Sequence, residues 1–329
     1  MSVSPGSGTE IGLEIRRARS DDRSAIVDLC RRSLGWDDAG TDAAFYSWKH
    51  DENPAGPSPA WVAVAPNGDV VGVRVFLRWR FVHQGRSLLG VRAVDTATDP
   101  DWRGRGVFSR LTLGALPGLR DDNIDFVFNT PNAQSRPGYL KMGWQPVGRL
   151  PVGVRFRPGA VRHIRSFRSP ADRWGQETHV GVSAPDAFGL PKTAALLERM
   201  NARTGIATEI SVDWLRWRYR FAPLAYRAVP LDGEDFANGM VVFRLRNRGP
   251  VLECTVCEVL TTPGTKVARR LAGLLDETEA DVMLVAPGKA SWGLVPMPLG
   301  PSLTWRPIGR PGAPTASELS LTMGDLELF

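Results

Sequence analysis

One stretch of the sequence decides the fold: Asp95-Thr96-Ala97-Thr98-Asp99-Pro100-Asp101-Trp102-Arg103-Gly104-Arg105-Gly106-Val107-Phe108-Ser109-Arg110-Leu111. It leaves a predicted strand over residues 87–98, passes a loop marked by Pro100, and enters a predicted helix over residues 104–116. The N-terminus of a helix has N–H groups without intrahelical partners and a partial positive charge, so this order favours a phosphate site at the start of the helix.

The loop before that helix has the composition of a phosphate site. Gly104 and Gly106 let the backbone approach a phosphate closely, and Arg103 and Arg105 add positive charge. The same letters also occur in RNA-binding Arg-Gly-Gly segments and in ordinary glycine turns. A single copy between a strand and a helix with apolar periodicity favours the phosphate loop.

The predicted elements around the loop follow an α+β order. We predict strands over residues 11–18, 61–65, 70–81, 87–98, 124–129 and from 144, and helices over residues 20–34, 41–50, 104–116 and 133–142. The fourth strand is followed by a helix and then another strand, which predicts a crossover connection.

The quoted stretch resembles the signature of the GNAT superfamily of acyl-CoA-dependent N-acyltransferases. That signature has Arg or Gln, two variable residues, Gly, one variable residue, and Gly or Ala, and it falls on Arg103–Phe108, with Phe108 in the last position. In that family these backbone amides hold the pyrophosphate of coenzyme A. The resemblance implies acetyl-CoA as co-substrate, bound by strand-end and loop residues: Thr96, Ala97, Thr98, Arg103, Gly104, Arg105, Gly106, Val107 and Phe108.

A second family mark follows about 30 residues later. The pattern is Asn, then Tyr seven residues on, then a variable residue, Lys, a variable residue, Gly and an aromatic residue; it falls on Asn132–Trp144. By resemblance, Asn132 contacts the pantetheine arm of coenzyme A and Tyr139 protonates the departing thiolate.

The reaction also needs a base and a group that polarises the thioester. A backbone N–H near Ala97 or Thr98 is our candidate for polarising the carbonyl. Many relatives carry a Glu base where this chain has Val127, so Asp95 on the fourth strand is the candidate base. Ordered water and the terminal carboxylate of the chain are the alternatives, and Asp95 could also be an exposed strand residue.

The second half of the chain repeats features of the first. Residues 45–54 resemble residues 214–223 at an offset of 169, with Trp48 matching Trp217 as expected core residues. We therefore predict two tandem GNAT folds, each a mixed, mostly antiparallel sheet flanked by helices. The expected segments are a flexible N-terminus (1–10), a catalytic domain (11–153), an Arg-rich connector (154–175) and a degenerate second domain (176–329).

The second copy lacks the glycines of the loop. Aligning Pro100 with Pro263 places Lys266-Val267-Ala268-Arg269 where the first copy has Arg103–Gly106. We predict that this copy binds no coenzyme A and helps to wall the acceptor cleft of the first copy.

Composition also indicates the charge of possible ligands, the cellular compartment and whether a metal is expected. The 329 residues include 41 Lys or Arg and 35 Asp or Glu, a formal net charge of +6. Only five of the basic residues are Lys, so Arg strongly predominates. A GC-rich genome explains this predominance of Arg. Guanidinium groups also suit phosphate or carboxylate partners. Three cysteines and no export signal predict a reduced, cytoplasmic protein. No metal is expected, because the four histidines lack ligand spacing and Cys254 and Cys257 would point to opposite faces of a strand.

These observations predict an N-acyltransferase that moves an acetyl or short acyl group to a primary amine. A non-catalytic acyl-CoA sensor or scaffold is the alternative from another class. An aminoacyl-tRNA-dependent aminoacyltransferase is a further alternative, although such enzymes lack the pyrophosphate signature. We expect a small-molecule amine acceptor, no nucleic acid or membrane partner, and a monomer or homodimer.

Overall fold

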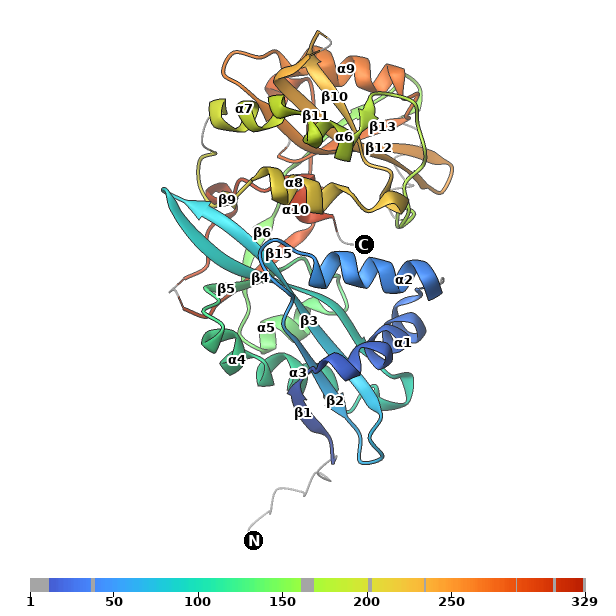
Figure 1. Cartoon of the computed structure of the whole chain (residues 1–329), viewed down its shortest axis with the longest axis vertical. Helices are drawn as coiled ribbons and strands as arrows, with labels where there is room; N and C mark the ends of the chain where they lie inside the picture. Colours follow the sequence, from blue (N-terminus) through green and yellow to red (C-terminus); the bar gives the residue numbers. More distant parts are fainter. Residues whose placement is uncertain are drawn as a thin grey trace.

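The computed structural model describes residues 12–36, 39–160, 169–200, 203–233, 235–287, 289–309 and 312–327. Within these residues the chain forms two β-sheets, one in each half of the molecule (Figure 1). The predicted α+β class with two mixed, mostly antiparallel sheets and flanking helices is confirmed.

The first sheet contains most of the predicted N-terminal strands. Its described strands are β1 (Glu14–Arg17), β2 (Ala60–Val64), β3 (Val70–His83), β4 (Arg86–Thr98), β5 (Phe126–Asn129), β6 (Gln145–Arg149), β9 (Ala207–Thr208) and β15 (Ser302–Pro307). The order is β1-β2-β3-β4-β5-β15-β6, and β9 also pairs with β3. In this order β4 and β5 run parallel and the other neighbours run antiparallel.

The second sheet repeats this topology. Its described strands are β7 (Val152–Phe156), β8 (Val182–Ser183), β10 (Arg227–Asp232), β11 (Asp235–Arg248), β12 (Val251–Thr261), β13 (Val282–Val285) and β14 (Val295–Met297). The order is β8-β10-β11-β12-β13-β7-β14, with β12 and β13 parallel and the other neighbours antiparallel. Position by position, the directions match those of the first sheet, as a duplicated fold requires.

The two sheets exchange one strand. In the first sheet, β15 from the C-terminal part of the chain lies between β5 and β6. In the second sheet, β7 from the N-terminal part lies between β13 and β14. The expected segments therefore do not follow the sheets: residues 152–156 are a strand of the second sheet rather than the end of the first domain and the start of a connector. The rest of the Arg-rich segment includes residues 161–168, which lie outside the described residues.

Helices cover the outer faces and fill the space between the sheets. The described helices are α1 (Arg23–Leu34), α2 (Ala39–Tyr46), α3 (Val107–Gly114), α4 (Leu116–Asp121), α5 (Arg136–Lys141), α6 (Ala184–Gly189), α7 (Pro191–Arg199), α8 (Val212–Tyr219), α9 (Val267–Glu277) and α10 (Met323–Leu326). Apolar residues of α3, α4 and α5 pack on one face of the first sheet, and those of α9 pack on the second sheet. A shared core joins α1 and α2 to α6 and α8 between the halves.

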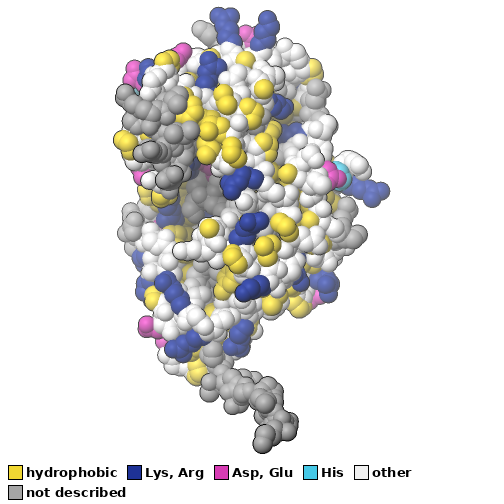
Figure 2. All heavy atoms as spheres, turned by 180° about the vertical axis from the view of Figure 1, so that it is seen from behind, with side chains coloured by type: hydrophobic (Ala, Val, Ile, Leu, Met, Phe, Trp, Pro, Cys, Tyr) yellow, Lys and Arg dark blue, Asp and Glu magenta, His cyan; other side chains and the backbone are white. Residues whose placement is uncertain are grey.

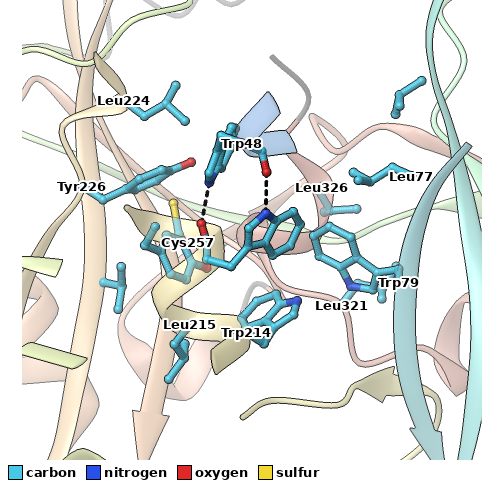
Figure 3. Close-up of a cluster of buried hydrophobic side chains, with 14 of the residues drawn as sticks. Trp48, Leu77, Trp79, Trp214, Leu215, Leu224, Tyr226, Cys257, Leu321 and Leu326 are labelled. Carbon is cyan, nitrogen blue, oxygen red and sulfur yellow. Dashed lines mark hydrogen bonds between the residues drawn. The ribbon is translucent and has the colours of Figure 1, made fainter. Parts of the chain in front are cut away.

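Trp48 and Trp217 pair with each other within the shared core, part of which, with Trp48 labelled, is drawn in Figure 3. Trp48 donates from Nε1 to the carbonyl oxygen of Trp217 at 2.5 Å, and Trp217 donates from Nε1 to the carbonyl oxygen of Trp48 at 2.6 Å. Their ring centroids lie 6.0 Å apart. The prediction that these residues are core anchors is confirmed, and their reciprocal bonds give the two copies a local two-fold relation.

The structure also bears on the Cys254 and Cys257 pair, on metal binding and on membrane-crossing helices. Cys254 packs with the α9 side of the second sheet and Cys257 with the shared core, so the two thiols lie on opposite faces as predicted. Among the described residues, no group of His, Cys, Asp and Glu side chains is arranged to hold a metal ion. Over the same residues, every helix is too short or too polar to cross a bilayer.

Candidate active site

The loop predicted to bind phosphate is open and its amides are available. β4 ends at Thr98, a 3₁₀ turn follows over Pro100–Trp102, and α3 begins at Val107, three residues later than predicted. The delay has a backbone cause, because Gly104 and Gly106 have φ of 75° and 74°, values that favour glycine. The N–H groups of residues 104–109 donate no hydrogen bond to any described residue, and a Cβ at either glycine would meet nothing within 4 Å.

The side chains of the loop leave this space clear. Arg103 donates from Nε to the carbonyl oxygen of Thr98 at 3.4 Å, and the guanidinium carbon of Arg105 lies 5.0 Å from the Trp102 ring centroid. Phe108 turns inward and packs edge-to-face on Tyr139, with ring centroids 5.3 Å apart. The bulk of Phe108 is therefore directed into the core of the first half, and its amide remains at the helix start.

A cleft opens where β4 and β5 separate. Their parallel pairing ends at Arg92 and Phe128, and among the described strands residues 93–98 of β4 have no partner on that side. The cleft has a volume of about 630 Å³. Its lining includes Ala93, Val94, Asp95, Thr96, Asn129, Asn132 and Tyr139 from the first half, and Asp172, Arg173, Arg244 and Arg246 from the rest of the chain.

The cleft thus brings together four of the residues singled out in the sequence, namely Asp95, Thr96, Asn132 and Tyr139. Ala97 is buried, and Thr98 ends the strand that leads from the cleft to the loop.

The Tyr139 hydroxyl faces the cleft without a described partner. Tyr139 lies on α5 with 4% of its surface exposed, between Phe108 and Trp144, and its hydroxyl forms no hydrogen bond with a described residue. Asn132 fixes the entry to α5, because its Oδ1 accepts from the backbone N–H groups of Gln134 and Ser135 at 3.1 and 2.9 Å. The side-chain Nδ2 of Asn132 forms no hydrogen bond with a described residue, so it can donate to a ligand in the cleft.

Asp95 is an ion-paired residue at a bulge of β4. The register of β3 and β4 shifts between Val73 and Val75, and Asp95 has a φ of 41°. Its carboxylate accepts from His50 Nε2 at 2.7 Å and lies 2.8 Å from Lys49 Nζ.

These contacts make Asp95 a poor base. Burial opposes the charged form, but Lys49 and His50 outweigh it and hold the pKa of Asp95 well below its usual range. Burial also lowers the pKa of Lys49 and of His50, partly opposed by Asp95. A carboxylate with a lowered pKa accepts a proton less readily, so the structure argues against the predicted role. The alternative base, the terminal carboxylate, lies outside the described residues.

Residues beyond the first half complete the wall of the cleft, and they belong to neither of the two sequence motifs. Arg244 and Arg246 of β11 both contact the carboxylate of Glu327, at 2.9 and 3.3 Å. Burial opposes ionisation of Glu327, but Arg244, Arg246 and Arg218 outweigh it and lower its pKa to about 2. In the second sheet β11 has the position that β3 has in the first sheet, so the repeat was the signal that could have found these residues.

The second copy differs from the first at the point where its two parallel strands separate, which corresponds to the cleft between β4 and β5. Pairing of β12 with β13 ends at Val256 and Val285. Just beyond, Thr322 donates from its hydroxyl to Glu258 at 2.8 Å, and the Cys257 thiol lies 3.5 Å from Glu327. The C-terminal segment of the chain therefore packs against the part of β12 that corresponds to the cleft-lining part of β4.

Comparison with known proteins agrees with this geometry. Residues 14–147 match the family model described as Acetyltransferase (GNAT) domain. In sequence, residues 14–147 are thus similar to a GNAT-type acetyltransferase domain, and the fold and the cleft of this part of the chain agree with that similarity. No curated protein matches the chain in sequence.

Solved structures match the chain over both halves. A probable N-acyltransferase from Enterococcus faecalis superimposes with a TM-score of 0.66 at 13% identity, covering 90% of this chain and 73% of that one. A GCN5-related N-acetyltransferase from Kribbella flavida gives 0.58 at 17% identity, covering 90% and 72%. Eis1 from Mycobacterium abscessus gives 0.56 at 15% identity, covering 90% and 73%. At these identities the likeness shows the fold that the two halves share with these proteins.

Proposed function

We propose that the chain transfers an acetyl or short acyl group from acyl-CoA to a primary amine of a small molecule. The observation that carries this proposal is the open loop at residues 103–106 with the first turn of α3. The N–H groups of residues 104–109 have no described partner, and the loop follows β4, which lines the cleft together with Tyr139. Two phosphate groups fit such a loop because the amides and the dipole of α3 favour negative charge. Lys and Arg side chains lie over both halves of the face drawn in Figure 2, with few acidic ones, and this charge would attract the anionic donor.

The geometry supports direct attack on the thioester. The pantetheine arm would lie along the open edge of β4, near the amide of Asn132. A backbone N–H near Ala97 or Thr98, in the part of β4 that has no described partner on the β5 side, would polarise the carbonyl oxygen. The amine nitrogen attacks the carbonyl carbon, the C–S bond breaks with its electron pair going to sulfur, and Tyr139 gives its proton to that sulfur. The nitrogen loses its proton to water, while Asp95 holds the bulge in place through Lys49 and His50.

The second half is proposed to act as a wall of the acceptor site. Its loop lacks the two glycines, and its own C-terminal segment packs where the first copy has a cleft. We propose that it binds no coenzyme A. We also propose a cytoplasmic protein that is a monomer or homodimer and needs no nucleic acid or membrane partner.

Thiol release from acetyl-CoA with a panel of amines tests the proposal. The panel holds amino sugars, polyamines and short peptides with free N-termini. Tyr139→Phe should lower turnover by about 10²- to 10⁴-fold, the usual contribution of a general acid, without weakening coenzyme A binding. Tyr46→Phe makes the same change at a buried tyrosine of the shared core and should leave turnover unchanged.

The same experiment separates the enzyme from the alternatives. A sensor or scaffold would bind coenzyme A and show no turnover with any amine. Absence of coenzyme A binding would instead favour the aminoacyl-tRNA-dependent alternative and would contradict the proposal.

A further inference from the structure

Arg74 of β3 is a buried cation that has no acidic partner among the described residues. Its side chain is fully buried, and none of the ion pairs between described residues involves it. Its Nη1 donates to the Thr96 hydroxyl, while its Nε and Nη2 have no hydrogen-bond partner in the described part of the chain. A buried, uncompensated charge destabilises a fold strongly, so this arrangement calls for a functional explanation.

Aromatic rings surround the guanidinium of Arg74. Its central carbon lies 5.1 Å from the ring centroid of Phe76, 5.2 Å from that of Tyr139 and 5.5 Å from that of Phe108. All three distances are within the range of cation–π attraction, about 6 Å. The same side chain therefore contacts the proposed acid, Tyr139, and the bulge of β4 through Thr96, which both line the cleft.

We propose that Arg74 is a positioning residue whose charge stabilises Tyr139 as a phenolate during acyl transfer. The inference rests on the proposed function. When the C–S bond breaks, its electron pair goes to sulfur and the Tyr139 proton follows, which leaves coenzyme A as the thiol and Tyr139 as an anion. The phenolate then takes a proton from solvent, which balances the proton that the amine gave to water.

The charge of Arg74 stabilises the phenolate of Tyr139 more than it stabilises the neutral phenol. A neutral phenol attracts a cation only through its ring quadrupole, whereas a phenolate carries a full negative charge a few ångströms away. Arg74 is fully buried and Tyr139 nearly so, and the added attraction is therefore weakly screened by solvent. An interaction that is stronger after proton transfer lowers the barrier to that transfer and leaves substrate binding unchanged.

A packing role alone makes a different prediction. If Arg74 only filled the space between three rings, Met would replace it well, because an apolar side chain of similar length needs no desolvation. Both explanations therefore expect Arg74→Met to unfold at the same temperature as the wild type, or higher. Turnover separates them, because the proposal expects this variant to be slow and a packing role leaves its turnover unchanged.

Steady-state kinetics with acetyl-CoA and the most active amine of the panel test the proposal. Arg74→Met should lower kcat by about 10- to 100-fold, a part of the general-acid contribution, with the KM for acetyl-CoA within about twofold. Arg74→Lys keeps a charge and should retain more kcat than Arg74→Gln, which keeps a donor for Thr96 without the charge. This Lys and Gln pair carries the test if the Met variant does not fold.

The decisive comparison repeats these substitutions in the Tyr139→Phe background. No phenolate forms there, so Arg74→Met should cause no further loss and the Lys and Gln variants should be equal. An unchanged kcat in Arg74→Met, or the same loss in both backgrounds, overturns this proposal and leaves the proposed function intact. Full turnover in Tyr139→Phe overturns the role of Tyr139 as acid and this inference with it, whereas no turnover with any amine overturns the proposed function itself.

Discussion

Gly106→Ala should separate coenzyme A binding from stability. Gly106 has a φ of 74°, so a side chain there costs about 1–2 kcal/mol of strain, and no atom of a described residue outside the loop lies within 4 Å of the new Cβ. The new Cβ either occupies the open space in front of the loop N–H groups, or the loop changes its conformation and these N–H groups no longer point into that space. Losing one charge-assisted bond from an amide to a phosphate costs about 1.5–3 kcal/mol, a weakening of roughly 10- to 150-fold in Kd.

Gly85→Ala is the matched control for this change. Gly85 also has a φ of 74° and open space around its Cβ, but it lies in the turn before β4, at the opposite end of that strand from the loop. Thermal unfolding should show a similar loss of stability in both variants. Calorimetric titration with coenzyme A should show weaker binding only in Gly106→Ala, and equal affinity of the two variants would refute the assignment of the loop.

Three further predictions concern the core and the second half. Glu327 has a pKa lowered from 4.5 to about 2, so its ion pairs contribute about 3 kcal/mol above pH 4.5 and lose this contribution as the pH falls toward 2. Urea unfolding should therefore show Glu327→Gln less stable than the wild type at pH 7 and nearly equal to it near pH 2; a difference that does not change with pH contradicts this sign. Trp48→Phe and Trp217→Phe each leave a buried carbonyl oxygen without its donor and should each cost about 1–3 kcal/mol of unfolding free energy, whereas a loss in only one of them would contradict the two-fold relation. Calorimetry of the intact chain should give one coenzyme A per chain, and a second site would show that the second copy is not degenerate.

Local patterns predicted most of the first sheet and the loop. The strands before and after the quoted stretch, the glycine-marked start of α3 and the Trp48–Trp217 match depend on residues near in sequence or on a repeated pattern. These predictions agree with the structure because residues near in sequence determine the backbone conformation and the apolar periodicity of an element. The helix start was placed too early, since glycines with a positive φ extend the loop up to Val107.

Features that depend on contacts far apart in the sequence could not be predicted. β7 is compatible with either sheet, and its place between β13 and β14 is fixed only by the assembled halves. Asp95 was predicted as a base because its partners, Lys49 and His50, lie on a different segment of the chain. Arg74 sits in a strand where a charged residue normally faces solvent, and only the packed rings show that it does not.

The most direct test of the account is to observe the loop amides themselves. In protein labelled with ¹⁵N at glycine, the resonances of Gly104 and Gly106 can be assigned by their loss in Gly104→Ala and Gly106→Ala. Addition of coenzyme A should shift these two resonances, as expected when an amide begins to donate to a phosphate oxygen, while Gly85 stays in place. Saturating coenzyme A that leaves both loop resonances unmoved would contradict the claim that this loop holds the diphosphate.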